Sequence, residues 1–411
     1  MWKQVFDRML SRLIVIGRLG VTFPDGTRAL YGRDEDSLRG AMQVLDDRAL
    51  RRMCLKPELG FAEGYMAGRV TFQGSTLEDT MRLAMRNVAR GGRMPPWVRL
   101  AERAQFRLRP VKQRNTALRS RFNVAHHYDI SDDLYRLFLD RDMQYSCAYF
   151  ADPNTSLDDA QEAKKAHIAA KLRIEPGMRV LDIGCGWGGM ALTLARDHGA
   201  RVLGVTLSEN QLAAARARAA EAGLEGRVEF RLVDYRALDE AFDRIVSVGM
   251  LEHVGVPQYG VYFDKVSDLL APEGVALIHT IGRCGPPTIQ SGFLNKYIFP
   301  GGYVPSMSEL APPIERAGLW HLDIEILRLH YARTLRHWLA RFEANLDRVR
   351  EMYDAQFIRM WRFYLVSCIL SFEEFNQAVF QFQLGHARDA VPLTRDYLYQ
   401  AAAPTWQYAA K

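Results

Sequence analysis

The first stretch whose residue types suggest chemistry is a glycine-rich segment that carries one carboxylate. It reads Val-Leu-Asp-Ile-Gly-Cys-Gly-Trp-Gly-Gly over residues 180–189, and its first residues have the apolar character of a buried strand. Gly184, Gly186 and Gly189 match the fingerprint of a turn that brings the backbone close to a nucleotide-containing ligand. These glycines alone do not distinguish a nicotinamide dinucleotide from other ligands of this kind.

Two features favour a methyltransferase over a dehydrogenase. An NAD site needs Asp or Glu at the end of the second strand to bind the ribose hydroxyls, whereas this chain has Val-Thr-Leu-Ser at residues 205–208. Asp182 lies two residues before the first glycine, where a carboxylate meets no pyrophosphate but can pair with an amino-acid ammonium group. The pattern Asp182-x-Gly184-x-Gly186-x-Gly188 is typical of enzymes that use S-adenosylmethionine.

Two further strand ends are expected to contact the same ligand. Thr206, Leu207 and Ser208 end the second strand, and Gln211 lies at the start of the following helix. Ser208 and Gln211 also have the spacing of a helix capping box, which is the alternative role for Gln211. Asp234-Tyr235-Arg236 follow the third strand, where such folds hold adenine, and the tyrosine could stack on the base; the alternative is an ordinary turn.

A second group of reactive side chains follows the fourth and fifth predicted strands. Glu252 and His253 come shortly after strand 244–248, and His279 lies at the end of strand 274–280. Because the carboxyl ends of parallel strands meet at one edge of a sheet, these side chains are expected near the glycine loop. Adjacent Glu and His side chains do not easily point at one ion, so no metal is predicted.

These segments, in this order, resemble the cyclopropane-fatty-acyl-phospholipid synthases, in the family that includes the mycolic acid cyclopropane synthases. The resemblance spans roughly residues 120–385 and is carried by segments 127–131, 145–150, 182–188, 206–211, 249–255, 279–282 and 295–302, with Tyr331, Thr334, Leu335 and Trp338. Residues 57–66 resemble the amino-terminal domain of the phospholipid-acting synthases, which the shorter mycolic enzymes lack.

The resemblance implies a cis double bond of a lipid acyl chain as substrate. Its π electrons attack the sulfonium methyl, and loss of a proton from the added methyl then closes a cyclopropane ring. In the family a bound bicarbonate is the base, held by groups that match the Cys147 backbone, Glu252, His279, the Ile281 backbone and Tyr331. Glu252 is expected to accept the proton of bicarbonate in a hydrogen bond, because an ionised carboxylate would otherwise repel the anion.

Other roles also follow from the resemblance alone. Tyr145 and Ser146 match residues against the methionine end of S-adenosylmethionine, and Cys368 matches a cysteine proposed as catalytic. The chemistry needs no thiol, and Cys368 lies on an apolar helical stripe, which favours a structural role. Aromatic rings could stabilise cations at the site by about 1–2 kcal/mol each, the alternative being plain packing; these are Tyr145, Tyr149, Phe150, Tyr297 and Phe299.

The elements that must position these residues alternate between strands and helices from Ser156 onward. Strands are predicted at 178–183, 201–207, 228–233, 244–248 and 274–280, with helices between them. This alternation predicts an α/β fold with a doubly wound, mostly parallel sheet, that of the class I S-adenosylmethionine-dependent methyltransferases. Added C-terminal helices are predicted from apolar stripes over 335–349 and 355–382, which form either core or the walls of an apolar channel.

Three segments are predicted along the chain. Residues 1–95 form a small α+β docking domain, 96–122 a basic linker and 123–411 the catalytic domain. Residues 100–121 carry seven Lys or Arg and one acidic residue, which predicts either a phosphate-contacting strip or a solvated connector. Residues 1–125 hold 24 basic and 12 acidic side chains of the 54 and 48 in the chain, which indicates an anionic partner.

Membrane phospholipid is the expected anion, because the residues that match the bicarbonate site imply a lipid substrate. Five scattered cysteines, no long apolar run and no cleavage site predict a cytoplasmic protein at the inner face of the membrane. The resemblance also implies a homodimer. The rival predictions are a methyl-branched or methylene product from the same family, a nucleic-acid methyltransferase, for which no base-binding motif follows the fourth strand, and a non-catalytic lipid-binding protein.

Overall fold

The computed structural model describes residues 1–33, 38–113 and 131–400, so residues 127–130 of the predicted motif lie outside it. The chain divides into two compact units. The first contains Met1–Lys112, Thr288–Pro300 and Leu335–Gln377, and the second contains Gln113–Pro287, Gly301–Thr334 and Ala378–Lys411.

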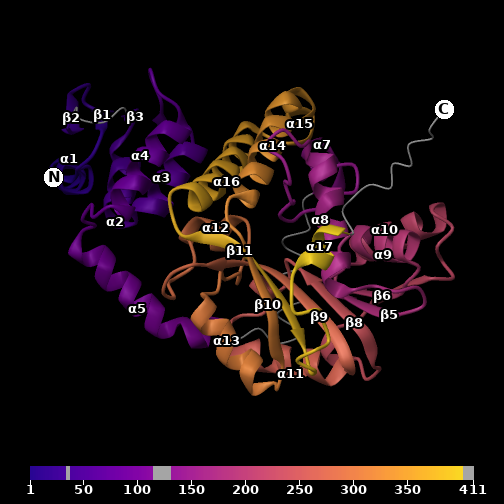
Figure 1. Ribbon diagram of the computed structural model, residues 1–411. Helices are drawn as coiled ribbons and strands as arrows, with labels where there is room; N and C mark the ends of the chain where they lie inside the picture. The colour runs from indigo at the N-terminus through magenta and orange to yellow at the C-terminus, as the bar shows by residue number, and fades with distance from the viewer. Residues whose placement is uncertain (34–37, 114–130, 401–411) are drawn as a thin grey trace, which may run out of the picture. The chain divides into compact units, whose positions relative to one another are not determined.

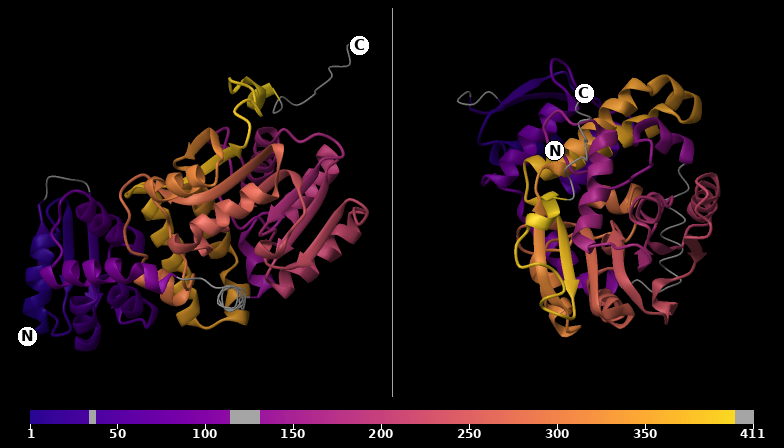
Figure 2. Two further views of the ribbon diagram at one scale, coloured as in Figure 1. Left: turned by 90° about the horizontal axis from the view of Figure 1, so that it is seen from below. Right: turned by 45° about the vertical axis from the view of Figure 1, so that its right-hand side comes forward.

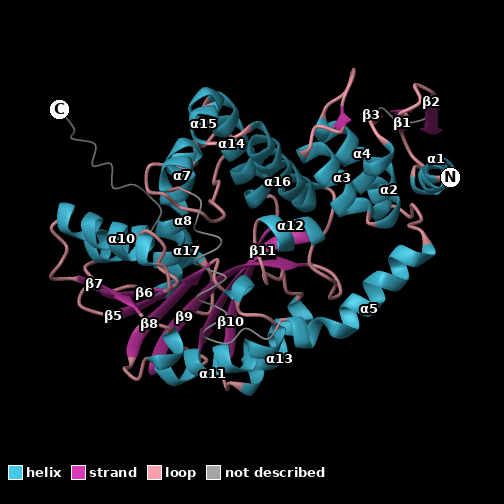
Figure 3. Ribbon diagram, turned by 180° about the vertical axis from the view of Figure 1, so that it is seen from behind, coloured by secondary structure: helices cyan, strands magenta, loops and turns pink. Residues whose placement is uncertain are grey.

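The second unit is built on a seven-stranded sheet (Figures 1 and 3). Its strand order is β10-β11-β9-β8-β5-β6-β7. The strands are β5 (Arg179–Ile183), β6 (Arg201–Thr206), β7 (Val228–Leu232), β8 (Phe242–Val248), β9 (Leu270–Arg283), β10 (Trp320–Leu327) and β11 (Gln377–Gly385). The neighbouring strands β9, β8, β5, β6 and β7 pair in parallel in this order, and β10 pairs antiparallel with β11. The predicted doubly wound, mostly parallel sheet is confirmed.

Helices cover both faces of this sheet and bury a separate apolar cluster on each (Figure 2). One cluster joins the strands to α8 (Leu157–Leu172), α9 (Gly189–His198) and α10 (Glu209–Glu221). The other joins them to α11 (Tyr259–Leu269) and α13 (Met307–Arg316). Val180 belongs to the first cluster and Leu181 to the second, as the alternation of side chains along a strand requires.

The path of the chain places a topological switch point between β5 and β8. From β5 the chain runs to β6 and β7 on one side, and it then returns to β8 and β9 on the other. In such sheets a crevice for ligands forms at the carboxyl ends of the two strands that flank this point. Asp182 with the glycine loop ends β5, and Glu252 follows β8, so both predicted groups lie at this edge.

The first unit joins a four-stranded sheet to helices from three stretches of the chain. The sheet has the order β2-β1-β3-β4, made by β1 (Arg18–Thr22), β2 (Arg28–Gly32), β3 (Arg39–Val44) and β4 (Val70–Thr71). The helices are α1 (Trp2–Leu13), α2 (Asp47–Leu55), α3 (Pro57–Met66), α4 (Leu77–Ala89), α5 (Pro96–Lys112), α12 (Gly292–Tyr297), α15 (Leu346–Met352) and α16 (Ala355–Glu373). None of the described helices is long and apolar enough to cross a bilayer.

Short elements complete the list. They are α7 (Asp132–Phe138), α14 (His330–Ala344), α17 (Asp396–Gln400) and the 3₁₀ turns Tyr235–Ala237, Leu251–His253 and Val256–Gln258. The division between the two units falls within α14.

Two sequence predictions differ from the structure. The helix predicted over 355–382 ends at Glu373, and the buried strand β11 begins at Gln377, where Phe380, Phe382 and Leu384 alternate with Gln381 and Gln383 as in a strand. The predicted boundaries at residues 95 and 122 also differ from the observed grouping, in which residues 288–300 and 335–377 pack with the amino-terminal segment.

Candidate active site at the switch point of the sheet

Asp182 is buried at the end of β5 and has an unpaired oxygen. Its Oδ2 has no hydrogen-bond partner within the described part of the chain. Burial raises the pKa of Asp182 to about 7, and the positive charge of Lys164 opposes that rise. A buried carboxylate without a partner is costly, and a ligand ammonium group would remove that cost. The residue therefore fits the amino group of S-adenosylmethionine.

The glycine loop after Asp182 keeps its backbone open to a ligand. Gly184, Gly186 and Gly188 all have positive φ angles, which a residue with a Cβ atom rarely adopts. A Cβ atom on Gly186 would meet no atom within 4 Å, whereas one on Gly188 would lie 2.7 Å from the ring of Phe230. Gly186 thus faces open space, and Gly188 is needed for packing below the loop.

The end of β6 forms a small buried polar cluster. The Thr206 hydroxyl donates to Gln211 Oε1 at 3.0 Å and accepts from the Ser208 backbone N–H at 3.1 Å. Ser208 caps α10 by accepting from the Gln211 N–H. The capping box is therefore only half formed, since the Gln211 side chain bonds to Thr206 instead of the Ser208 backbone. Leu207, between them, is partly buried.

The segment after β7 holds its own charges in place. Asp234 accepts hydrogen bonds from the backbone and the guanidinium of Arg236, at 2.6–3.0 Å. The Tyr235 ring packs edge-on against Tyr262 with centroids 5.5 Å apart. Burial raises the pKa of Tyr235. Arg236 is thus held by Asp234, and the turn has a structural explanation that does not need adenine.

A buried lysine that the sequence reasoning missed supports the methionine end of the predicted site. Lys164 Nζ on α8 donates to Ser146 Oγ at 2.8 Å and to Gln144 Oε1 at 2.6 Å. Burial lowers the pKa of Lys164 to about 8. Tyr145, beside Ser146, packs edge-on against Tyr135 with centroids 5.1 Å apart. The only sequence signal was a lysine pair, Lys164-Lys165, on a helix that had to cover a parallel sheet.

Glu252 presents a buried carboxyl group on the other side of the switch point. Its Oε1 accepts the Ile281 backbone N–H at 2.5 Å, and its Oε2 is buried without a hydrogen-bond partner among the described residues. Burial raises the pKa of Glu252 to about 7, although the Ile281 N–H opposes the rise. Such a carboxyl group can accept a hydrogen bond when it is ionised and donate one when it is protonated, which fits a bound bicarbonate.

His279 is held as a neutral imidazole by a residue that was not predicted. Gln381 on the neighbouring strand β11 donates from Nε2 to His279 Nδ1 at 3.1 Å. Burial lowers the pKa of His279 to about 3. Since Nδ1 accepts, the single proton of the ring lies on Nε2, which becomes the donor. The signal in the sequence was a set of glutamines inside the apolar run of residues 377–385.

Cys147 and Tyr331 are brought together by bonds between two distant stretches of the second unit. Thr334 Oγ1 accepts the Ala148 N–H at 3.0 Å, and His330 Nδ1 accepts the Phe150 N–H at 3.0 Å. Tyr149 stacks between the rings of His167 and His330, at 4.4 and 5.1 Å. The first turn of α14, which carries buried Tyr331, is therefore fixed against the segment that carries the Cys147 backbone.

Three of the predicted residues belong to the first unit instead. Cys368 lies on α16, and burial raises the pKa of its thiol to about 12, so the sulfur is protonated at neutral pH. Tyr297 donates to Glu63 at 3.0 Å, and Phe299 packs edge-on against Tyr364 at 5.9 Å. Packing within the first unit accounts for both rings. No group of three His, Cys, Asp or Glu side chains in the described ranges converges as metal ligands.

Two stretches of the chain match known protein families. The family of mycolic acid cyclopropane synthetases matches residues 115–382, and a domain family of unknown function matches residues 1–90. The chain is 44% identical to the cyclopropane-fatty-acyl-phospholipid synthase of Escherichia coli K12 over 246 residues, which cover 60% of this chain and 63% of that one. It is 33% identical to a tuberculostearic acid methyltransferase of Mycobacterium tuberculosis, over 92% of this chain and 90% of the relative.

A solved structure also matches part of the chain. It is a mycolic acid cyclopropane synthase complexed with SAH and CTAB, with a TM-score of 0.61 and 34% identity, covering 64% of this chain and 97% of the other. The fold at the switch point and the family match agree with the sequence resemblance. The chain belongs to the mycolic acid cyclopropane synthetase family of S-adenosylmethionine-dependent methyltransferases.

Proposed function

We propose that this protein converts cis double bonds in the acyl chains of membrane phospholipids into cyclopropane rings. S-adenosylmethionine supplies the electrophilic methyl group when bound, and bicarbonate is the proposed base. The proposal assigns Asp182, the glycine loop, Ser146 and the Thr206–Gln211 cluster to the methyl donor. It assigns Glu252, His279, Tyr331 and the Cys147 and Ile281 backbones to the anion.

The observation that carries this proposal is that one sheet edge holds both a buried carboxyl oxygen without a partner among the described residues, on Glu252, and a neutral imidazole donor, on His279. Glu252 Oε2 can accept a hydrogen bond from the O–H of a bound bicarbonate, and His279 Nε2–H can donate one to its charged oxygen. A nucleophilic amine or hydroxyl loses an acidic proton from the nucleophilic atom itself, and one side-chain base beside that atom can accept it. An alkene substrate instead needs a base at the added methyl, since that methyl must lose a proton to close the ring.

The described residues around this site also exclude water. Glu252 and His279 are buried, and so are Leu251, Ile278 and Tyr303 around them. A dry, weakly basic environment lets a carbocation persist until its proton is removed rather than being captured by water. Cys368 has no part in this proposal, because its thiol is protonated at neutral pH.

One observation favours a second product within the same chemistry. The tuberculostearic acid methyltransferase matches over 92% of this chain, including the amino-terminal segment. A methyl-branched alkene would arise if the carbocation lost a proton from the substrate chain, and a methylene chain if a hydride shift moved the charge to the methyl-bearing carbon before the methyl lost its proton. Membrane attachment at the inner face, the docking role of the basic first segment and a homodimer belong to the proposal by resemblance alone.

Mass spectrometry of phospholipid acyl chains tests this proposal. The full chain is incubated with S-adenosylmethionine and vesicles of unsaturated phosphatidylglycerol and phosphatidylethanolamine. A gain of 14 mass units with loss of the double bond is expected, and the new chain should survive ozonolysis uncleaved. Retention of a double bond would assign the second product. Unmodified lipid, together with methylation of RNA in a parallel incubation, would overturn both the cyclopropane and the branched-chain product.

A further inference from the structure

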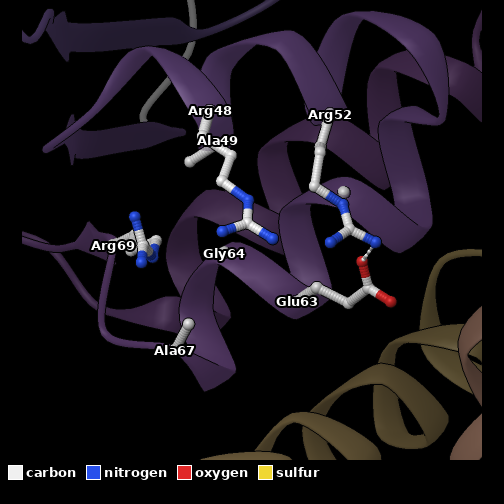
Figure 4. Close-up of a pocket in the computed structure, with 8 residues that line it drawn as sticks. Arg48, Ala49, Arg52, Glu63, Gly64, Ala67 and Arg69 are labelled. Carbon is white, nitrogen blue, oxygen red and sulfur yellow. Dashed lines mark ion pairs between the residues drawn. The ribbon is translucent and has the colours of Figure 1, made fainter.

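A small pocket in the first unit is lined by three arginines (Figure 4). It lies against α2 and α3 and has a volume of about 170 Å³. Its lining consists of Arg48, Ala49, Arg52, Gly60, Glu63, Gly64, Ala67 and Arg69. The α3 residues fall within segment 57–66, the part of the chain that resembles the phospholipid-acting synthases and has no role in the proposed active site.

Two glycines bring the walls of this pocket close together. A Cβ atom on Gly60 would lie 2.4 Å from the Arg52 backbone carbon, and one on Gly64 would lie 2.8 Å from Val70 Cγ2. The helices therefore touch through their backbones. As a result the long side chains of Arg48 and Arg52 extend over α3 rather than into solvent alone, as Figure 4 shows.

The ion pairs around the pocket leave positive charge in excess. Arg52 pairs with Glu63, which also accepts from Lys296 at 2.7 Å. Arg69 pairs with Asp46. Arg48 has no ion pair among the described residues, and its guanidinium lies between those of Arg69 and Arg52 in Figure 4. Four cations thus face two carboxylates, and an oxyanion would balance the excess.

We infer that this pocket binds the phosphate group of a phospholipid headgroup. An arginine fork matches phosphate oxygens in two parallel hydrogen bonds, and neighbouring paired arginines preorganise the site. Inorganic phosphate shares this chemistry, but the surroundings favour a lipid. Leu45 and Leu55 flank α2 at its two ends and are about half exposed, so apolar side chains border the basic pocket. Such a border suits a membrane interface.

The inference deepens the proposed function and rests on it, because a phospholipid is the proposed substrate. Arg48→Gln is the informative variant, because Arg48 is exposed and has no ion pair among the described residues. Its replacement therefore leaves no described carboxylate without its partner. Arg8→Gln is the matched control: it removes the charge of an exposed side chain on α1 and does not touch the pocket. Thermal melting of each full-length variant establishes that it is folded.

Binding to vesicles of phosphatidylglycerol in phosphatidylcholine is measured by cosedimentation at fixed ionic strength. Arg48→Gln is expected to weaken binding about fivefold, the equivalent of ~1 kcal/mol for one arginine at an anionic surface. Arg8→Gln should change it less than twofold. Equal binding by the two variants would overturn the inference, because the charge would then act without regard to its position.

Two further measurements distinguish a lipid phosphate from free phosphate, and the headgroup site from the proposed function. Dihexanoyl phosphatidylglycerol, but not equimolar inorganic phosphate, should raise the melting temperature of the wild type more than that of Arg48→Gln. The same rise with inorganic phosphate would assign a free-anion site and overturn the headgroup. Vesicle binding requires no turnover, so a wild type that binds but transfers no methyl group refutes only the proposed function.

Discussion

Gln381 Nε2 lies 3.1 Å from His279 Nδ1, and this contact between neighbouring strands sets which nitrogen of the imidazole carries its proton. An amide nitrogen can only donate, so Nδ1 must accept and Nε2 must hold the hydrogen. Burial keeps the ring neutral by lowering the pKa of His279 to about 3. The imidazole therefore acts as a fixed hydrogen-bond donor near pH 7 and not as an acid.

Replacing Gln381 by Met should reduce the turnover rate about tenfold or more while leaving the affinity for the methyl donor unchanged. Without the amide, the ring can place its proton on either nitrogen, and only one tautomer can donate toward the proposed anion. The ¹⁵N chemical shifts of His279 should show both tautomers in the variant. Gln383→Met is the matched control, because Gln383 is buried in the same strand but bonds to the Lys171 carbonyl at 2.5 Å. Equal losses of rate in both variants would indicate a structural role only.

Glu252→Gln should abolish product formation and yet stabilise the protein at pH 8. The pKa of Glu252 is raised from 4.5 to about 7 by burial, so between these values the folded state keeps a proton that the unfolded state releases. Stability is therefore lost as pH rises from about 4.5 to 7. The Gln side chain does not ionise, so Glu252→Gln should raise the free energy of unfolding at pH 8 by up to ~3 kcal/mol, from the relation of pKa to free energy.

Urea unfolding of wild type and Glu252→Gln at pH 5 and pH 8 measures this effect. The two proteins should differ much more at pH 8 than at pH 5. A variant that is inactive and also less stable at both pH values would mean that the carboxyl group is paired in the folded state, contrary to its unpartnered Oε2.

The positions of the main site residues could be predicted because they follow from strand order. Asp182 lies at the end of β5 and Glu252 follows β8, while His279 lies within β9 opposite Val248, the last residue of β8, so parallel pairing brings all three to one edge. Lys164 and Gln381 could not be found in this way. Both are polar residues in apolar surroundings, and their partners, Ser146 and His279, lie 18 and 102 residues away in the sequence. Only the packed fold shows that the polar atoms meet.

The limits of the fold prediction have a similar cause. Local patterns placed the strand that precedes the glycine loop within one residue, because the apolar run and the turn glycines bound it on both sides. No local signal showed that residues 335–377 pack with the amino-terminal segment, since an apolar helix face does not indicate which segment packs against it. The strand β10 was missed although Leu322, Ile324 and Ile326 alternate with Asp323 and Glu325, which is the period of a half-buried strand.

Asp182 and Lys164 should jointly control the pH dependence of methyl-donor binding. Ionised Asp182 is needed to pair with the ligand ammonium, so affinity should rise as pH increases through about 7. Lys164 lowers the pKa of Asp182 by its positive charge, so Lys164→Met should move this transition to higher pH. Asp182→Asn should weaken binding at least tenfold and remove the transition. Calorimetric titration with S-adenosylhomocysteine from pH 6 to pH 8.5 measures all three.

Lys165→Met is the control for the loss of a buried lysine. Lys165 is as buried as its neighbour, but it pairs with Asp142 at 2.6 Å and Glu162 at 3.1 Å. Its removal should leave the midpoint of the transition near that of the wild type. A midpoint that moves equally in both lysine variants would show that general destabilisation, and not the field at Asp182, is responsible.

Phe363 on α16 should stabilise the amino-terminal helices and not the seven-stranded sheet. Its ring lies 6.0 Å from Phe61, 6.3 Å from Tyr65 and 4.6 Å from Phe293, all within the first unit. Truncation of such a buried ring to Ala costs about 3–5 kcal/mol. Hydrogen exchange should therefore accelerate in α3 while β5 keeps its protection, and exposed Phe375→Ala should change neither. Faster exchange in β5 alone would instead place α16 with the catalytic domain predicted over residues 123–411, because truncating Phe363 destabilises the core against which α16 packs.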